Sequence, residues 1–156
     1  MDDTDFQLPA PLSARRIVVA MSGGVDSSVA AALLAEQGHD VVGLSMQLYD
    51  QSSSDAAQTL HAEGSRTFGS CCSLDDLYDA RHVAAALQIP HYILNLAREF
   101  DERVISNFLQ EYSAGRTPLP CTHCNSDLKF ATLAERAAGF GADWVATGHY
   151  AQVAFD

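Results

Sequence analysis

Short apolar runs alternate with stretches of helical spacing along most of the chain. Residues 17–20, Ile-Val-Val-Ala, form a β-branched run typical of a buried parallel strand. From Ser27 onward, Ala and Leu recur at helical spacing, and Gly38 is a suitable C-terminal stop for that helix. Further strands are expected at about 40–48, at "HYILNL" and at "DWVAT".

Three more helices are expected between these strands. "SLDDLYDARHVAAALQIP" begins with a serine N-cap and an acidic first turn and stops at Pro90. The others are expected at about 99–113 and 127–139, separated by the loop "AGRTPLPCTHCN", and the apolar spacing of "ISNFLQEY" and "ATLAERAAGF" indicates core packing. Residues 51–70 are rich in Ser, Gly and Ala and are expected to form a long loop, while Trp144 is expected to pack under the sheet.

Strands that alternate with crossover helices predict an α/β fold, a doubly wound parallel sheet with helices on both faces. Ligands of such folds bind at the carboxyl ends of the strands. The chain has 156 residues, of which 47% are hydrophobic and 19% charged, which suits one globular domain over residues 15–156. Residues 1–14 are acidic, contain two prolines and are expected to form a disordered leader.

Composition also restricts the partners and the compartment. No apolar run approaches the roughly 20 residues that span a bilayer, so no membrane association is expected. The leader is the reverse of a secretory signal, which favours a cytoplasmic protein whose four cysteines are thiols or metal ligands. The net charge of −11 repels a polyanion, so an RNA partner would need a local basic patch or another domain.

The string "SGGVDSS" at residues 22–28 lies where the first strand passes into the first helix. Gly23 and Gly24 allow close backbone approach, and the serines add hydroxyl donors at the positive end of a helix dipole, so the turn predicts a phosphate site. The string lacks the lysine and the spacing of a Walker A motif. Asp26 would oppose phosphate unless it binds Mg²⁺ or orders the turn. The simpler alternative is a glycine-rich turn whose Asp and Ser cap the helix.

This string resembles the pyrophosphate loop (PP-loop) of the N-type ATP pyrophosphatases, a superfamily with an adenine nucleotide alpha hydrolase-like, Rossmann-like fold. The strings "CCSLDDLYDARHVAAALQIPHYILN" and "GRTPLPCTHCNSDLKF" resemble, more narrowly, the tRNA-specific 2-thiouridylase family of the MnmA type. The resemblance extends from Arg16 to about Val153. It implies an ATP-dependent enzyme that adenylates the 2-oxygen of the wobble uridine and supports its replacement by persulfide sulfur. Its partners would be tRNA and a persulfide sulfur carrier.

The resemblance also implies roles for individual residues. The expected ATP contacts are Ala20, Met21, Ser22, Gly23, Gly24, Val25, Asp26, Ser27, Met46 and Gly148. Residues near the target base would be Leu119, Pro120 and Cys121, with His149 close to the tRNA. Leu119 departs from the asparagine usual in the family, which removes one expected base contact. Later tRNA-binding domains of the family would follow residue 156, so this chain is expected to be inactive alone.

The cysteines admit two chemical interpretations. Cys124 is expected just before a helix that begins near Asn125, with Arg116 and Lys129 in reach, and both features favour a thiolate. The resemblance makes Cys124 the nucleophile and places Cys121 where many members have Asp. Cys121 and Cys124 also form a C-x₂-C pair that could bind an iron–sulfur cluster or zinc, although either centre normally takes three or four ligands.

Three other interpretations stay open at this point. Cys71 and Cys72 could complete a four-thiol site, but they are more simply read as partly buried thiols. The histidines at positions 61, 82, 91 and 123 lack ligand-like spacing and are expected to be surface or hydrogen-bonded residues. The rival functions are another PP-loop nucleotide-activating sulfurtransferase and a non-catalytic thiol or metal-binding module.

Overall fold

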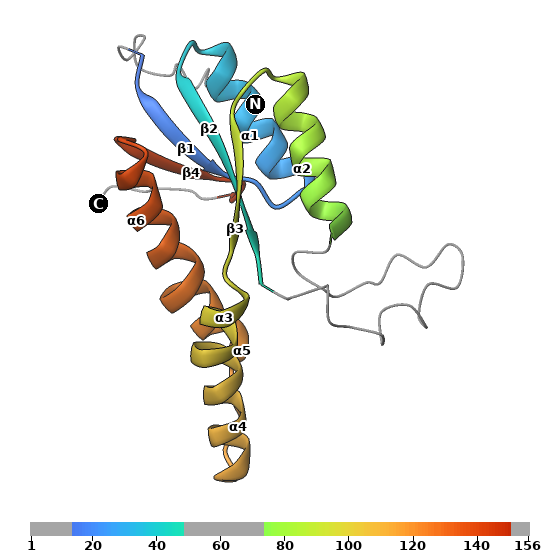
Figure 1. The fold of residues 1–156 in the computed structure, drawn as a ribbon, viewed down its shortest axis with the longest axis vertical. Coiled ribbons are helices and arrows are strands. Elements are labelled where there is room, and N and C mark those ends of the chain that lie inside the picture. Colours follow the sequence, from blue (N-terminus) through green and yellow to red (C-terminus); the bar gives the residue numbers. More distant parts are fainter. Residues whose placement is uncertain (1–13, 49–73, 151–156) are drawn as a thin grey trace, which may run out of the picture.

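The computed structural model describes residues 14–48 and 74–150, which contain a four-stranded parallel sheet (Figure 1). β1 (Arg16–Ala20) lies between β2 (Asp40–Gln47) and β4 (Trp144–Thr147), and β3 (His91–Asn95) completes the order β3-β2-β1-β4. The chain therefore winds from β1 to β2 and β3 in one direction and then crosses to β4 on the other side. This reversal puts a topological switch point between β1 and β4.

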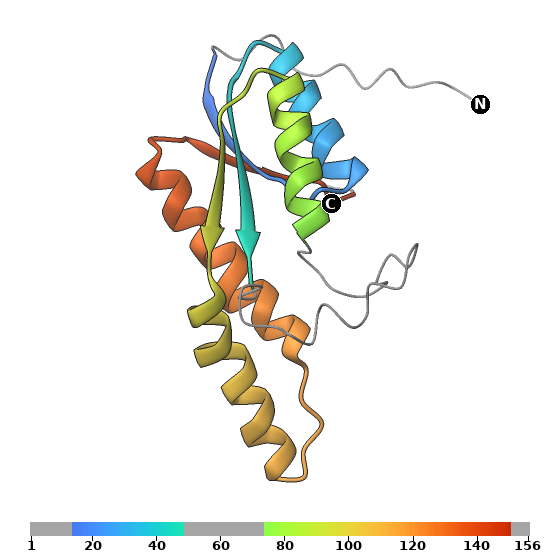
Figure 2. The ribbon, with the colours of Figure 1, turned by 45° about the vertical axis from the view of Figure 1, so that its right-hand side comes forward.

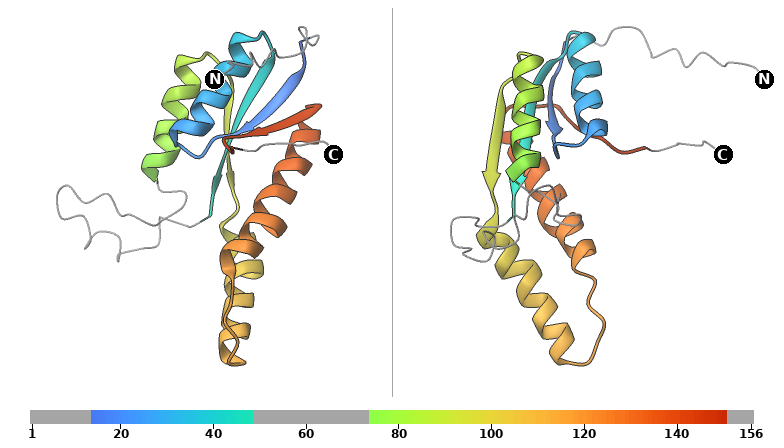
Figure 3. Two further views of the ribbon diagram at one scale, coloured as in Figure 1. Left: turned by 180° about the vertical axis from the view of Figure 1, so that it is seen from behind. Right: turned by 90° about the vertical axis from the view of Figure 1, so that its right-hand side faces the viewer.

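Helices cover both faces of the sheet (Figures 2 and 3). α1 (Val25–Glu36) and α2 (Leu74–Ala86) lie side by side on one face. The other face carries two helical stretches, the second of which packs along the sheet. These stretches are α3 (Ala97–Phe100), η1 (Asp101–Ile105) and α4 (Ser106–Ser113), then α5 (Pro120–His123), η2 (Cys124–Phe130) and α6 (Ala131–Gly139), with η1 and η2 being π-helical. The predicted doubly wound α/β fold is confirmed.

Two hydrophobic cores form, one on each face, because successive residues of a strand point to opposite sides. Ile17 and Val19 of β1 point toward α1 and α2, where they join Ala31 and Ala80. Val18 points the other way. It packs in the second core with residues of β2, η1, η2 and α6, among them Leu44, Val104, Leu128 and Leu133. The unbroken apolar run of β1 is thus explained by burial on both faces.

The predicted strands and most of the predicted helices are confirmed, but the prediction of one loop is wrong. The segment expected to be irregular up to residue 125 turns helical at Pro120, and the helix then continues through η2 and α6 to Gly139. A proline is well suited to the first helical turn because its missing N–H would have no intrahelical partner there. The "PLPC" string therefore starts a helix at Pro120, five residues before Asn125 and seven before residue 127, where its start was expected.

Two packing predictions also fail. The apolar side chains of "ISNFLQEY" were expected in the core, and the first of them, Ile105, does pack against the second core. The rest lie in α4, which contains no buried residue, because the hairpin that it forms extends beyond the sheet (Figure 1). Trp144 was expected under the sheet but is 55% exposed, with the Arg15 guanidinium 5.5 Å from its ring centroid. By contrast, "ATLAERAAGF" packs as predicted, through Leu133 and Ala137.

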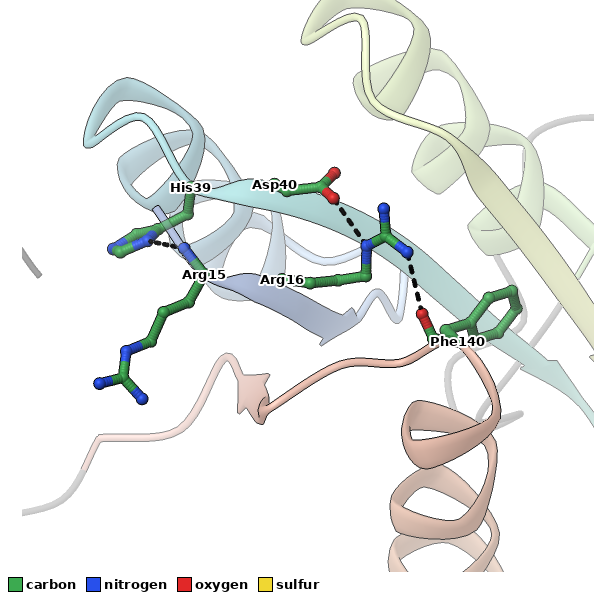
Figure 4. A network of polar contacts seen from close by, with 5 residues as sticks. All are labelled: Arg15, Arg16, His39, Asp40 and Phe140. Atoms are coloured by element: carbon green, nitrogen blue, oxygen red, sulfur yellow. Dashed lines mark hydrogen bonds and ion pairs between the residues drawn. The ribbon is translucent and has the colours of Figure 1, made fainter. Parts of the chain in front are cut away.

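A polar network closes the amino end of the sheet (Figure 4). Arg16 Nε donates to Asp40 Oδ2 at 2.6 Å, and its Nη1 donates to the Phe140 carbonyl at 3.2 Å. The Arg15 backbone N–H reaches His39 Nδ1 at 3.4 Å. The ion pair is half exposed, so it contributes no more than about 1 kcal/mol. It ties β1, β2 and the end of α6 together at the edge opposite the carboxyl ends of the strands.

Some expectations lie outside the described residues: the leader up to residue 13, the loop at 51–70, and Cys71 and Cys72. Within the described ranges, none of the helices has the length and apolar character needed to span a membrane.

Candidate nucleotide-binding cleft

A cleft of about 280 Å³ opens at the carboxyl ends of β1 and β4, at the switch point of the sheet. Folds of this kind bind their ligands at this position. Most of the residues expected to bind ATP line it. These are Ala20, Met21, Ser22, Gly24, Asp26, Ser27, Met46 and Gly148, and His149 joins them. The structure therefore brings together residues that lie more than a hundred positions apart in the sequence.

Hydrogen bonds among hydroxyls fix the turn from β1 into α1. Ser27 Oγ accepts from the Ser22 backbone N–H at 3.2 Å and donates to the Gly24 carbonyl at 3.0 Å. Ser22 Oγ lies 3.3 Å from Ser27 Oγ, and Ser28 Oγ donates to the same Gly24 carbonyl at 2.9 Å. Ser27 is buried, so its hydroxyl forms these hydrogen bonds beneath the surface of the loop. The turn is thus set before any ligand arrives.

The glycines of this region differ in what they do. Gly23 has φ +81°, and a Cβ there would lie 2.6 Å from the Asp76 Cα of α2. Gly148 packs so closely on α1 that a Cβ would lie 2.8 Å from the Ser27 Cα. Gly24 has room for a Cβ, since among the described residues only Ser22 Oγ would lie near it, at 3.5 Å. Gly23 and Gly148 are therefore required by the fold, whereas Gly24 is free to face a ligand.

The amino end of α1 supplies the donors of the cleft. The N-cap of α1 is Gly24, which has no side chain to accept hydrogen bonds from the N–H groups of the first turn. The first N–H groups of a helix have no intrahelical partner and carry partial positive charge, so they suit an anion. The side chain of Val25 is 76% exposed, and neither Val25 nor Gly23 lines the cleft. These two expected ATP residues therefore belong to the loop without facing its ligand space.

The opposite wall comes from η2 and α6 and was largely missed from the sequence. Asn125, Lys129 and Leu133 line the cleft, spaced four residues apart along one helical stretch. Lys129 is half-buried and, among the cleft-lining residues that the structure describes, is the one basic side chain other than histidine. Its ammonium group is suited to a phosphate. The four-residue spacing in "CNSDLKFATL" is the signal that could have found this wall.

Carboxylates and the exit of β4 complete the site. Asp26 and Asp76 line the cleft, and Asp26 Oδ1 accepts a 2.9 Å hydrogen bond from the Tyr150 hydroxyl. That hydrogen bond, together with the negative charge of Asp26, raises the pKa of Tyr150. His149 Nδ1 lies 2.8 Å from Thr147 Oγ1, and its ring is 6.0 Å from that of Phe130. The carboxylate oxygens of Asp26 and Asp76 are ligands of the type that Mg²⁺ prefers.

Residues 119–124, which include the two described cysteines, are not among the residues that line the cleft. Leu119 and Cys121 are exposed, and Pro120 is the first residue of α5. Cys124 is only 5% exposed and packs in the core beside α6. The prediction that a helix begins just after Cys124 is wrong, since the first turn holds Cys121 instead.

The charged residues expected beside Cys124 are also used elsewhere. Arg116 makes two hydrogen bonds to Glu111, of 2.5 and 2.6 Å, and Lys129 faces the cleft. Among the described residues, no group of three or more His, Cys, Asp or Glu could hold a metal ion. The cysteines therefore lie apart from the cleft and contribute two thiols, one exposed and one buried.

A family model described as "tRNA methyl transferase HUP domain" matches residues 15–156. The chain belongs to this family. It is 53% identical over 142 residues to a tRNA-specific 2-thiouridylase MnmA of Geotalea uraniireducens and 56% identical over 137 residues to that of Magnetococcus marinus. These matches cover 91% and 88% of this chain but 36% of each relative, so the chain spans about a third of their length. The resemblance drawn from the three motifs is confirmed.

Solved structures support the fold. An NH₃-dependent NAD synthetase from Campylobacter jejuni matches with a TM-score of 0.54 and 18% identity, over 85% of this chain and 47% of that one. An NMN synthetase from Francisella tularensis matches with a TM-score of 0.50 and 18% identity, over 83% of this chain and 43% of that one. At this level of identity the likeness concerns the arrangement of strands and helices.

Proposed function

We propose that the cleft binds ATP, with the phosphates against residues 20–27 and the adenosine beside Met46. The observation that carries this proposal is the position of the loop: an uncapped helix end and a fixed set of hydroxyls face a cleft at the switch point of the sheet. Lys129 faces the loop across the cleft and balances phosphate charge. Gly148 and the other expected nucleotide residues that line the cleft keep their roles in this proposal, whereas Gly23 and Val25 contribute only to the shape of the loop.

The proposed activity is that of the nucleotide-activating part of a tRNA 2-thiouridylase. The 2-oxygen of the target uridine attacks the α-phosphorus of ATP, the bond to the β-phosphate breaks, and pyrophosphate leaves. Persulfide sulfur from a carrier then attacks the activated carbon, and AMP departs with the oxygen. The Cys124 thiolate attacks the carrier sulfur, so the S–S bond breaks, the 2-thiouridine is released and a disulfide joins Cys124 to the carrier. An external thiol reductant then reduces this disulfide. The high identity to enzymes named tRNA-specific 2-thiouridylase supports this assignment. Such an enzyme works on tRNA in the cytoplasm.

Mg²⁺ fits the donor set of the cleft. Asp26 and Asp76 would hold it together with serine hydroxyls, and the ion would offset phosphate charge. An iron–sulfur cluster fits less well, because the described residues offer Cys121 and Cys124 where three or four ligands are needed. No step of the proposed chemistry is therefore assigned to a cluster.

The sulfur chemistry is proposed for Cys124, with Cys121 beside it and residues 119–121 near the target base. His149, at the rim of the cleft, would contact the tRNA. Because Cys124 is buried, its reaction requires the stretch from Pro120 onward to shift when tRNA binds. Residues 15–156 would form the PP-loop domain, and the tRNA grip would come from other parts of the enzyme, as the net charge of −11 suggests.

Titration calorimetry with a non-hydrolysable ATP analogue and Mg²⁺ tests the nucleotide assignment. We expect the chain to bind the analogue and the Gly24→Val variant to lose binding while keeping its thermal transition, since the structure leaves room for a Cβ at this position but a ligand would occupy it. Absence of binding by the unsubstituted chain would favour a thiol or metal-binding module. Unchanged affinity in the variant would show that phosphate lies elsewhere.

A second assay addresses the sulfur transfer. The chain is incubated with ATP, Mg²⁺, a persulfide donor and unmodified tRNA, and the digested tRNA is examined by mass spectrometry. We expect nucleotide binding without 2-thiouridine, because this acidic chain has few phosphate contacts to offer tRNA. Clear formation of 2-thiouridine would show that residues 1–156 contain the whole activity.

A further inference from the structure

A buried polar contact connects the three strands behind the turn at residues 22–27, which is called the phosphate loop below. Ser45 of β2 is 1% exposed, and its hydroxyl donates a 2.7 Å hydrogen bond to the carbonyl of Met21. Met21 is the first residue after β1, and its N–H continues the ladder by donating to the Leu44 carbonyl at 2.8 Å. Met21 is therefore held by two successive peptide groups, through its N–H by the backbone of β2 and through its carbonyl by a serine side chain.

His91 of β3 completes the contact. Its Nε2 lies 2.9 Å from Ser45 Oγ. A serine has one proton, which Ser45 gives to Met21, so the hydrogen for this second contact comes from His91 Nε2. The chain of donors runs from His91 through Ser45 to the Met21 carbonyl and crosses β3, β2 and β1 in turn.

Gly43 makes room for this arrangement on β2. A Cβ at Gly43 would lie 2.7 Å from Met21 Sδ and 3.1 Å from His91 Cδ2. The Met21 side chain and the His91 ring therefore meet over the one residue of β2 that has no side chain. Gly43 and Ser45 lie two positions apart on the strand, on the same face, as the alternation of a strand requires.

The Met21 carbonyl is linked to the cleft through the next residue, Ser22, which lines it. Ser22 N–H donates to Ser27 Oγ, which sets the turn, and the orientation of this peptide group is coupled to that of the Met21 carbonyl because both belong to one planar unit. We propose that Ser45, supported by His91, is a positioning residue of the nucleotide site that fixes the Met21–Ser22 peptide and hence the phosphate loop. This inference rests on the proposed binding of ATP.

The test compares Ser45→Ala with Ser45→Thr in titrations with the same ATP analogue and Mg²⁺. Loss of the hydroxyl leaves a buried carbonyl without its donor, and we expect the alanine variant to bind about tenfold more weakly, which corresponds to about 1.4 kcal/mol. The threonine variant keeps the hydroxyl and is expected to bind within about threefold of the unsubstituted chain.

Val41→Ala is the matched control, because Val41 is buried on the same strand and the same face but at the amino end. It removes core contacts, so it lowers the melting temperature, yet it should leave the affinity for the analogue within about twofold. Equal losses of affinity in Val41→Ala and Ser45→Ala would show that general destabilisation explains the effect, and would overturn the proposal.

Two further outcomes are distinguishable. If Ser45→Ala has no thermal transition, the His91→Phe variant is tested in its place, because it removes Nε2 and keeps Ser45. An affinity for the analogue equal to that of the unsubstituted chain would then overturn the role of the pair. A weakening of about threefold or more would support it. If the unsubstituted chain binds no analogue, the proposed function fails first. If it binds and Ser45→Ala binds equally well, only the positioning role fails.

Discussion

The phosphate loop and the segment 119–124 both carry chemistry that the sequence suggests, but they are held in different ways. The loop is enclosed: Gly23 lies against α2, Gly148 lies against α1, and Ser45 fixes the Met21 carbonyl. The segment lies at the base of a helical hairpin that extends beyond the sheet, with Cys121 exposed and Cys124 turned into the core. The described residues thus line a cleft that we propose binds a nucleotide, whereas the thiols of Cys121 and Cys124 are not among the lining residues.

The largest effect is expected where the loop is most tightly enclosed. Gly23→Ala should lower the free energy of unfolding by about 3 kcal/mol, because a Cβ meets the Asp76 backbone and an L-residue is strained at φ +81°. Urea denaturation measures the loss. Gly24→Ala is the control and should cost less than about 1 kcal/mol, the penalty of a poorer N-cap. Similar losses in both variants would mean that the loop is not enclosed as described.

The segment 119–124 is tested by the accessibility of its thiols. Under native, reducing conditions followed by brief alkylation, Cys121 should react at least about tenfold faster than Cys124, because a buried thiol reacts only when its surroundings open. Mass spectrometry of the peptides measures both rates. In denaturant the two rates should converge, which controls for intrinsic reactivity. Fast native labelling of Cys124 would remove the contrast between the two regions.

Lys129 sharpens the comparison, since it belongs to the same π-helical segment as Cys124 but faces the cleft. Lys129→Ala should weaken binding of the ATP analogue about tenfold, the loss of one charged hydrogen bond. Arg116→Ala removes an equal charge from an exposed pair with Glu111 and should leave the affinity unchanged. Equal weakening by both variants would indicate a long-range charge effect, and the wall of η2 would then play no direct part.

The sequence predicts best where a local pattern determines the outcome. β1 and the loop after it were predictable because a β-branched run, two glycines and three serines are contiguous. Lys129 and Asp76 were missed as parts of the cleft, because tertiary packing brings them there from α2 and η2. The apolar side chains of α4 show the converse: helical spacing indicates a helix but does not identify what covers its face.

The predicted start of the helix near the cysteines was wrong for a related reason. Several residues of this stretch, among them its prolines, could each begin a helix. In the structure Pro120 is the first helical residue, so the helix begins before both cysteines. The effect on Cys124 was large, because moving the helix start by one turn takes its thiol from the positive end of a helix into the core. Residue type and spacing alone do not contain this information.

The smallest expected effect concerns the pH dependence of stability behind the loop. Burial, and to a lesser extent the charge of Arg81, lowers the pKa of His91 below 6.5 in the folded chain. Between the folded pKa and 6.5 the unfolded chain binds more protons, so this histidine's contribution to stability is present above pH 6.5 and is lost as the pH falls toward its folded pKa. When the pH is lowered from 7.5 to about 5.5, the melting temperature of the His91→Asn variant should therefore fall less than that of the unsubstituted chain. His82, exposed on α2, provides the control: His82→Asn should follow the unsubstituted chain. An identical pH dependence in all three proteins would show that His91 is solvated in solution and does not support Ser45.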